Sequence, residues 1–214
     1  MMNVDPHLQA VVEVALDEGE PLCPWPIADC KLFSLIRLSG KMTDREVGLV
    51  FAQLVNYNNL EGGGDTNNLL HQVIQAETLV LPGGLQVRSA HKLINPSCCC
   101  GLETWRDWLR FLKTSRSPWL GHDPSPWIEK AGGLIHVWSD KKAKAFHIDF
   151  EPSKFEAELS KVQQDLSGFL ARIEAWASRV GFSEPSKLSR KFDECFNVSH
   201  SQRLLPRGRS RRIH

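Results

Sequence analysis

Three consecutive cysteines, Cys98–Cys100, are the residues of this chain with the clearest capacity for chemistry. They stand directly before a predicted helix that begins near Leu102, and a helix N-terminus favours the thiolate form of a nearby cysteine. A thiolate is the nucleophile of cysteine-dependent enzymes, and His122 or His136 would then supply the base. Cysteine is also among the most frequently buried residue types, so a structural role in a tight turn is the alternative interpretation.

A second group of candidate ligands comes from two alternating segments between residues 134 and 150. A two-residue turn at Lys141-Lys142 would place His136 directly opposite His147 on neighbouring antiparallel strands. The same face carries two further side chains, Trp138 and Asp149. Cross-strand histidines with a carboxylate or a cysteine are ligands for zinc and related ions. The alternative is a polar face that meets solvent or a partner, as antiparallel sheets commonly present.

A proline-rich loop from Trp119 to Trp127 separates these two groups and carries His122-Asp123 between its prolines. The prolines make the loop stiff, and large side chains held at low entropic cost are good interface anchors. A loop that folds back on its own core is the alternative. The predicted binding residues are Trp119, His122, Asp123, Trp127, His136, Trp138 and His147, and we predict no catalytic residue and no metal ligand.

Hydrophobic periodicity predicts the elements that position these residues. Helical spacing predicts helices at residues 6–17, 29–38, 43–55, 69–74 and 102–113, the third opened by a capping box from Thr43 to Glu46. Alternation predicts strands near residues 127–130, 134–139 and 143–150, and a hairpin or paired extended segments at 79–81 and 85–87. A second capping box, from Ser153 to Glu156, opens the longest helix, which Gly181 ends.

These elements predict one α+β domain over residues 1–181. It has an N-terminal helical half, a small antiparallel β-meander and a long C-terminal helix packed on the sheet. Residues 182–214 are expected to form a basic tail that is partly disordered. Residues 1–181 carry 18 Lys and Arg against 22 Asp and Glu, whereas residues 182–214 carry 8 against 3. The acidic body argues against a nucleic-acid groove.

The composition bounds the class of protein. The chain has 214 residues, of which 42% are hydrophobic and 24% are charged, as is usual for a globular domain. Its apolar runs are too short for a membrane span, and its first residues lack the pattern of a secretion signal. Six cysteines, three of them adjacent, do not form a spaced disulfide framework. We therefore expect a cytoplasmic location without a membrane partner.

Three motifs carry a resemblance to other proteins: Leu79–Leu85, the run Cys98–Glu103 with Trp105 and Trp108, and Gly121–Trp127. On these motifs, and over residues 46–180, the chain resembles a group of uncharacterised bacterial proteins. The resemblance implies a bacterial cytosolic origin and brings no known activity with it.

The function that we expect is that of a non-catalytic protein-binding module of a bacterial cytosol. An immunity-type protein that neutralises a toxin is the form that we consider. Its partner would be another protein, and we expect no cofactor. The alternative is a metal-binding or cysteine-dependent enzyme that uses Cys98–Cys100 with His122, His136 or His147.

Overall fold

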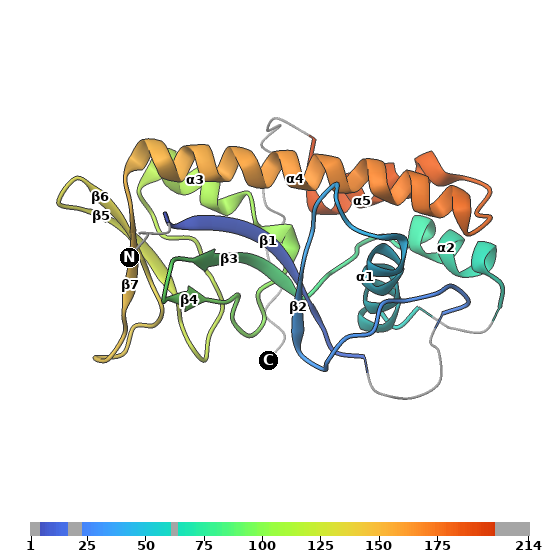
Figure 1. The fold of residues 1–214 in the computed structure, drawn as a ribbon, viewed down its shortest axis with the longest axis horizontal. Coiled ribbons are helices and arrows are strands. Elements are labelled where there is room, and N and C mark those ends of the chain that lie inside the picture. The colour runs from blue at the N-terminus through green and yellow to red at the C-terminus, as the bar shows by residue number, and fades with distance from the viewer. Residues whose placement is uncertain (1–4, 17–22, 61–63, 200–214) are drawn as a thin grey trace.

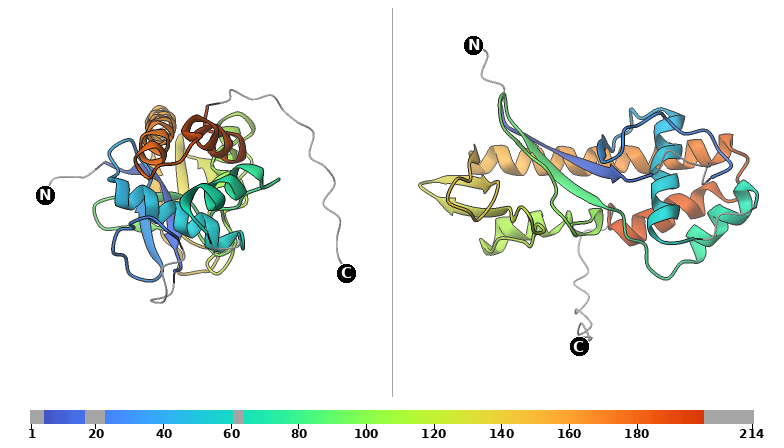
Figure 2. Two further views of the ribbon diagram at one scale, coloured as in Figure 1. Left: turned by 90° about the vertical axis from the view of Figure 1, so that its right-hand side faces the viewer. Right: turned by 90° about the horizontal axis from the view of Figure 1, so that it is seen from below.

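The predicted α+β class is confirmed by the structure. The computed structural model describes residues 5–16, 23–60 and 64–199, and these residues form two small antiparallel sheets and five α-helices. The longest helix, α4 (Pro152–Arg179), runs along one side of the whole molecule (Figure 1). Seen from below, the small sheet formed by residues 127–150 lies at one end of α4 (Figure 2). The two helices of residues 44–57 and 66–75 lie at the other end (Figure 2).

The first element is a strand, β1 (His7–Val14), where the sequence predicts a helix over residues 6–17. It is an inner strand of a four-stranded sheet in the order β2-β1-β3-β4, between β2 (Ser34–Arg37) and β3 (Gly83–Arg88). Five consecutive residues of β1 are buried, because both of its faces are covered. Such a strand is apolar at nearly every position and therefore also satisfies helical spacing, which makes the helix prediction wrong.

Two more predictions for the N-terminal half are wrong. The predicted helix at residues 29–38 contains the edge strand β2. The segment 85–87 belongs to β3, which pairs with β1 and with β4 (Leu93–Ile94) rather than with residues 79–81. A Cβ on Gly83 would collide with the carbonyl oxygen of Val11. Gly83 and Gly84, which the sequence suggests as a turn, instead lie in β3 opposite β1, and Gly83 lets the two backbones approach closely.

The predicted meander is confirmed as a three-stranded sheet of β5 (Trp127–Ala131), β6 (Leu134–Trp138) and β7 (His147–Phe150). Gly132 and Gly133, with φ of 57° and 80°, form the tight turn between β5 and β6. Ile135, Val137, Ile148 and Phe150 form its buried face.

The predicted register between β6 and β7 is wrong by two residues. Residues 139–146 join the strands, so Lys141-Lys142 is not a two-residue turn, and His136 lies opposite Asp149 while Trp138 lies opposite His147. A shift of two preserves the face on which each side chain lies. The predicted grouping of the histidines, Asp149 and Trp138 on one face is therefore correct.

The helices of the N-terminal half begin at side-chain caps. Thr43 and Glu46 form the predicted capping box of α1 (Asp44–Tyr57), in which the Thr43 amide donates to Glu46 Oε2 at 2.7 Å. Asp65 caps α2 (Thr66–Gln75) by accepting from the Asn68 amide at 2.9 Å.

The predicted helix over residues 102–113 is divided in two. A 3-10 turn, η1 (Leu102–Thr104), precedes α3 (Asp107–Thr114). Trp105, Trp108 and Phe111 are buried in the core. The helical spacing of Trp105 and Trp108 therefore locates the core-facing side correctly. Leu109 and Leu112, at the next helical positions, are only partly buried, and the chain is not one continuous helix.

Helix α4 is confirmed, but its N-terminus differs from the prediction. Pro152 occupies its first turn and Glu151 is its N-cap, so Ser153 lies inside the helix and the second capping box is wrong. Gly181, with φ of 77°, follows the end of the helix as predicted. The helix spans about 40 Å and packs on β1, β6, α1, α3 and α5. No helix in the described part of the chain combines the length and the apolar character needed to cross a membrane.

A final helix, α5 (Pro185–Phe196), packs on α4 within the segment predicted to be a basic tail. Its buried residues are Leu188, Phe192 and Phe196, and Val198 beyond it is also buried. Trp105 Nε1 donates to the carbonyl oxygen of Phe196 at 2.9 Å. The segment predicted as a basic tail therefore begins with a helix that belongs to the core. The disorder expected for the last residues concerns positions 200–214, outside the described ranges.

Candidate functional site

The three adjacent cysteines lie in the loop between β4 and η1, held against the loop of His122. Cys98 and His122 form an isolated antiparallel bridge, in which the His122 amide donates to the carbonyl oxygen of Cys98 at 3.3 Å. The Ser97 hydroxyl donates to the carbonyl oxygen of His122 at 2.7 Å. Gly121 has φ of 97°, and a Cβ there would lie 2.7 Å from the Cys98 carbonyl oxygen. The close approach of the two loops therefore requires glycine at this position.

The three thiols have two different environments. Cys100 is buried and its Sγ lies 3.7 Å from Thr104 Oγ1. Cys98 and Cys99 are exposed, with their sulfur atoms 3.3 Å apart, and Cys99 adopts a left-handed backbone conformation with φ of 63°. If the three cysteines had a purely structural role, at least two of them would be expected to be buried. The structure buries only Cys100, so this expectation is wrong.

The alternative considered for these cysteines, an activated thiolate, is not supported by their environment. Burial raises the pKa of the Cys100 thiol. The hydrogen bond with Cys99 raises the pKa of Cys98, and the negative charges of Asp123 and Glu13 act in the same direction. The helix that follows begins as a single 3-10 turn. Both shifts favour the protonated thiol at Cys98 and Cys100, which does not suit a nucleophile.

The His122-Asp123 pair lies at the rim of this loop. The Nδ1 atom of His122 is 3.2 Å from Asp123 Oδ2, and both side chains are exposed. The ring of Trp119 lies 6.5 Å from the His122 ring and the residue is 56% exposed. Trp119 therefore does not anchor the loop to the core, whereas Leu120 beside it is buried.

A cleft of about 860 Å³ opens beside the cysteine loop, between the two sheets. Its wall includes the cysteines Cys98–Cys100, the charged residues Glu13, Asp123, Asp140, Lys142 and Lys144, and the aromatic residues Tyr57 and Phe146. Glu13 comes from β1, and Asp140 comes from the loop between β6 and β7. The spacing of hydrophobic residues in the sequence does not show that these two segments meet. Neither residue is predicted as a site residue from the sequence. Glu13 was missed because residues 6–17 were predicted to form a helix and not the strand β1.

The exposed side of the β5–β7 sheet is the second place where candidate residues meet. We call it the tryptophan face, and it consists of Trp127, Glu129, His136, Trp138, His147 and Asp149. The rings of Trp127 and Trp138 stack with their centroids 5.7 Å apart and an interplanar angle of 6°. Trp138 Nε1 donates to Glu129 Oε1 at 2.9 Å. The indole rings are therefore fixed by each other and by the sheet.

Histidines and a carboxylate occupy the other half of the tryptophan face. The Oδ1 atom of Asp149 lies 2.6 Å from His136 Nδ1 and 3.3 Å from His147 Nε2. The Nε2 atom of His136 is 3.2 Å from the carbonyl oxygen of Ala131. His147 also packs on Trp138, with ring centroids 4.4 Å apart. Each of these polar atoms therefore has a partner within the sheet.

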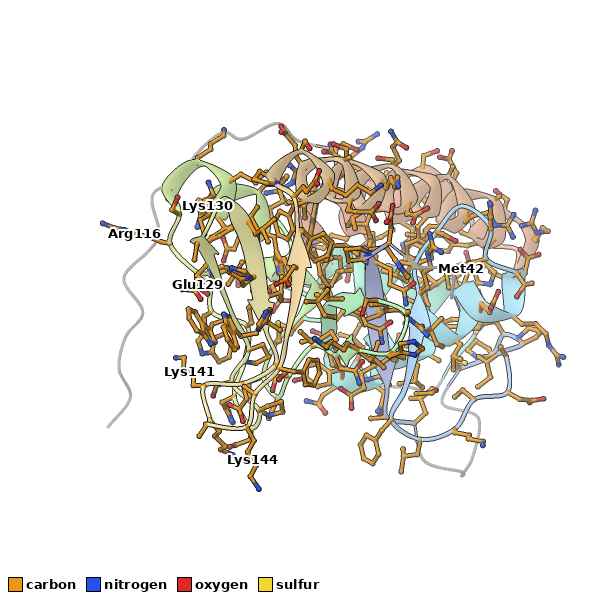
Figure 3. The ribbon with its side chains drawn as sticks, turned by 60° about the vertical axis from the view of Figure 1, so that its left-hand side comes forward. Met42, Arg116, Glu129, Lys130, Lys141 and Lys144 are labelled. Carbon is orange, nitrogen blue, oxygen red and sulfur yellow. The ribbon has the colours of Figure 1, made fainter. Side chains whose placement is uncertain are left out.

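A shallow hollow of about 530 Å³ borders the stacked indoles. Its walls are Trp127, Trp138, Asp140, Lys141, Lys142, Ala143 and Ala145. Figure 3 shows Lys141 and Lys144 projecting at the lower end of this side of the molecule, opposite Met42, while Lys130 lies at its upper end. The rim of the hollow thus carries two lysines and one aspartate, beside the aromatic rings of Trp127 and Trp138.

The predicted binding residues fall into two groups. Trp127, His136, Trp138 and His147 share the tryptophan face, whereas Trp119, His122 and Asp123 belong to the loop that meets Cys98. His136 and His147 form one cluster with Asp149, and Cys98 and Cys99 form another with His122. The structure therefore supports His122, and not the sheet histidines, as the neighbour of the cysteines.

Comparison of the chain with models of known protein families, with curated proteins and with solved structures finds no match.

The different exposure of the thiols leads to a testable expectation. In the native protein, an uncharged disulfide reagent should modify Cys98 and Cys99 well before Cys100, because access to Cys100 is blocked. Mass spectrometry of peptides from a time course identifies the modified residue. The rate at Cys98 should keep increasing with pH above the usual thiol pKa of about 8.5, because its pKa is raised. Equal rates for Cys98 and Cys100 would contradict the arrangement.

Proposed function

We propose that this chain is a protein-binding module that contacts its partner through the tryptophan face. The observation that carries the proposal is the stacked pair Trp127 and Trp138, fixed in orientation and only partly buried on an otherwise polar sheet face. Tryptophan is enriched at the energetic centres of protein interfaces, because its large surface is buried at low entropic cost. The opposite face of the same sheet is already buried in the core.

Charge indicates the chemistry of the partner. Lys141 and Lys142 are exposed at the rim of the hollow beside the indoles, and Lys142 Nζ lies 3.8 Å from Asp140 Oδ2. Such a rim favours a partner surface that presents carboxylates around a central apolar side chain. The apolar side chain would rest on the indole stack, and the carboxylates would face Lys141 and Lys142.

An immunity-type role in a bacterial cytosol, with a toxin as the partner, is the specific form of this function that we propose. Neutralisation by binding requires a rigid complementary surface and no reaction. The fixed indoles of the tryptophan face support such a surface. Identification of the partner in the experiment below decides between a toxin and another acidic protein.

Substitution of Trp138 by alanine tests the proposal. The partner is first isolated by co-purification with the tagged wild-type chain and identified, and its affinity is then measured with purified proteins. We expect Trp138→Ala to weaken binding by about 2 kcal/mol or more, as at an interface hot spot. This corresponds to a Kd at least roughly thirtyfold higher.

The matched control is Phe33→Ala, which removes an aromatic side chain that is 65% exposed in the segment between β1 and β2. This variant should bind the partner with unchanged affinity. A partner whose affinity is unaffected by Trp138→Ala would remove the tryptophan face from the interface.

A further inference from the structure

Two adjacent thiols exposed to solvent need an explanation, because cysteine is among the residue types most often buried. Cys98 and Cys99 are both exposed, while Cys100 beside them is buried. Their sulfur atoms lie 3.3 Å apart, and one imidazole, that of His122, joins them with a ligand atom within 4.8 Å of both. Two sulfur ligands and one nitrogen ligand therefore converge at the edge of the cleft.

The backbone holds these ligands in place without any bound ion. The bridge between Cys98 and His122 and the hydrogen bond from Ser97 fix the two loops to each other. The contact of Gly121 with the Cys98 carbonyl leaves no room for a Cβ. Cys99 is held with φ of 63°, a conformation that is uncommon for a residue other than glycine, asparagine or aspartate. The backbone therefore preorganises the three ligands, because the entropy lost in ordering them is lost on folding and not on binding an ion.

His122 has the hydrogen-bond pattern of a metal ligand. Its Nδ1 atom lies 3.2 Å from Asp123 Oδ2, so Nδ1–H can donate to the carboxylate while Nε2 keeps a free lone pair. Histidine ligands of zinc usually donate their second ring N–H to a carboxylate or a carbonyl, which fixes the tautomer and the ring orientation. Asp123 would therefore act as a positioning residue for His122.

The charged side chains that act on the Cys98 thiol are negative, although Lys142 and Lys144 also line the cleft. The charges of Asp123 and Glu13 both act on Cys98, and Glu13 and Asp123 line the same cleft. A negative field opposes a free thiolate but favours a cation, so the same charges that disfavour a nucleophilic cysteine assist metal binding.

We infer that Cys98, Cys99 and His122 form a binding site for a thiophilic transition-metal ion of the Zn²⁺ type. Each thiol releases its proton to solvent as its sulfur binds the ion, so two protons leave for each divalent ion bound. Three protein ligands leave a fourth tetrahedral position that faces the cleft, as in zinc sites that take a water or an exogenous ligand. The inference is independent of the tryptophan face and of protein binding.

The cluster of His136, His147 and Asp149 is the competing location for a metal. Its polar atoms already satisfy one another and the Ala131 carbonyl, as cross-strand polar side chains do on many exposed sheets. The two exposed thiols have no equivalent structural role. The experiment therefore includes variants of both clusters.

Titration of the reduced protein with Co²⁺, followed by displacement with Zn²⁺, tests the site. We expect one equivalent of Co²⁺ to produce a thiolate-to-cobalt charge-transfer band and the visible bands of tetrahedral Co²⁺, and Zn²⁺ to remove both. Metal binding should release two protons in weakly buffered solution. The expected loss of affinity in Cys98→Ser, Cys99→Ser or His122→Asn exceeds the roughly 10–100-fold cost of losing an outer partner, and Asp123→Asn should show that smaller cost.

The matched controls are Cys30→Ser, at a partly exposed cysteine outside the cleft, and the pair His136→Asn with His147→Asn. These variants should bind Co²⁺ as the wild type does. Because all the substituted ligands of the proposed site are exposed, the metal-free variants should keep the wild-type thermal midpoint. The inference is overturned if no charge-transfer band appears, if the band persists without Cys98 and Cys99, or if only the His136 and His147 variant loses binding.

Discussion

A chain that ends at Arg190 is expected to lose most of its folding stability. The deletion removes Phe192, Phe196 and Val198, all of which are buried. It also removes the Phe196 carbonyl oxygen that accepts from the indole of Trp105 at 2.9 Å. Loss of one buried phenylalanine side chain costs about 3–5 kcal/mol, and two such losses approach the total stability of about 5–15 kcal/mol for a domain.

Urea unfolding followed by circular dichroism measures this effect. A chain that ends at Ser199 is the control, because it keeps α5, Val198 and the acceptor for Trp105. Its unfolding midpoint should lie close to that of the full chain, while the chain that ends at Arg190 should show no cooperative transition or a far lower midpoint. Equal midpoints for the two truncated chains would show that α5 contributes little to the core.

Truncation of Leu166 in the middle of α4 is expected to cost about 2–5 kcal/mol of folding free energy. Leu166 is fully buried, on the stripe by which α4 covers the core. Alanine keeps the helix propensity high, so the loss comes from the cavity and from the apolar surface that is no longer buried.

Gln164→Ala is the matched control for Leu166→Ala, because Gln164 lies in the same turn of α4 but is exposed. Its free energy of unfolding should stay within about 0.5 kcal/mol of the wild type. The denaturant slope should be similar in both variants, so that the change in midpoint reports stability. A wild-type midpoint in Leu166→Ala would remove this part of α4 from the core.

The long helix and the meander could be predicted because their patterns are local. The stripe of α4 repeats over about six turns, and the alternation of buried and more exposed residues is uninterrupted in β6 and β7. The first strand could not be predicted, because a strand buried on both faces carries no alternation to separate it from a helix. Helix α5 was missed although Leu188, Phe192 and Phe196 recur every four residues, because three buried apolar positions in twelve residues give a much shorter stripe than that of α4.

The candidate site could be predicted only in part. The three adjacent cysteines identified their loop as a candidate site. Because alternate residues of a strand share one face of the sheet, His136, His147 and Trp138 could also be placed on one face. The pairing partner of Cys98 is a contact between distant loops, which sequence spacing does not encode. The separate environments of Cys99 and Cys100 depend on one left-handed residue, which only the folded backbone shows.

The position of α4 has a consequence for the way in which the molecule opens. The two sheets form separate hydrogen-bonded ladders among the described residues, and α4 packs on a strand of each, β1 and β6. Neither sheet can separate from α4 without exposing part of the same apolar stripe. Amide protons in the middle of α4 are therefore expected to exchange only through global unfolding. The slowest amide protons of the two sheets should give one common free energy of opening, equal to that of global unfolding. The helix makes two independent ladders into one cooperative unit.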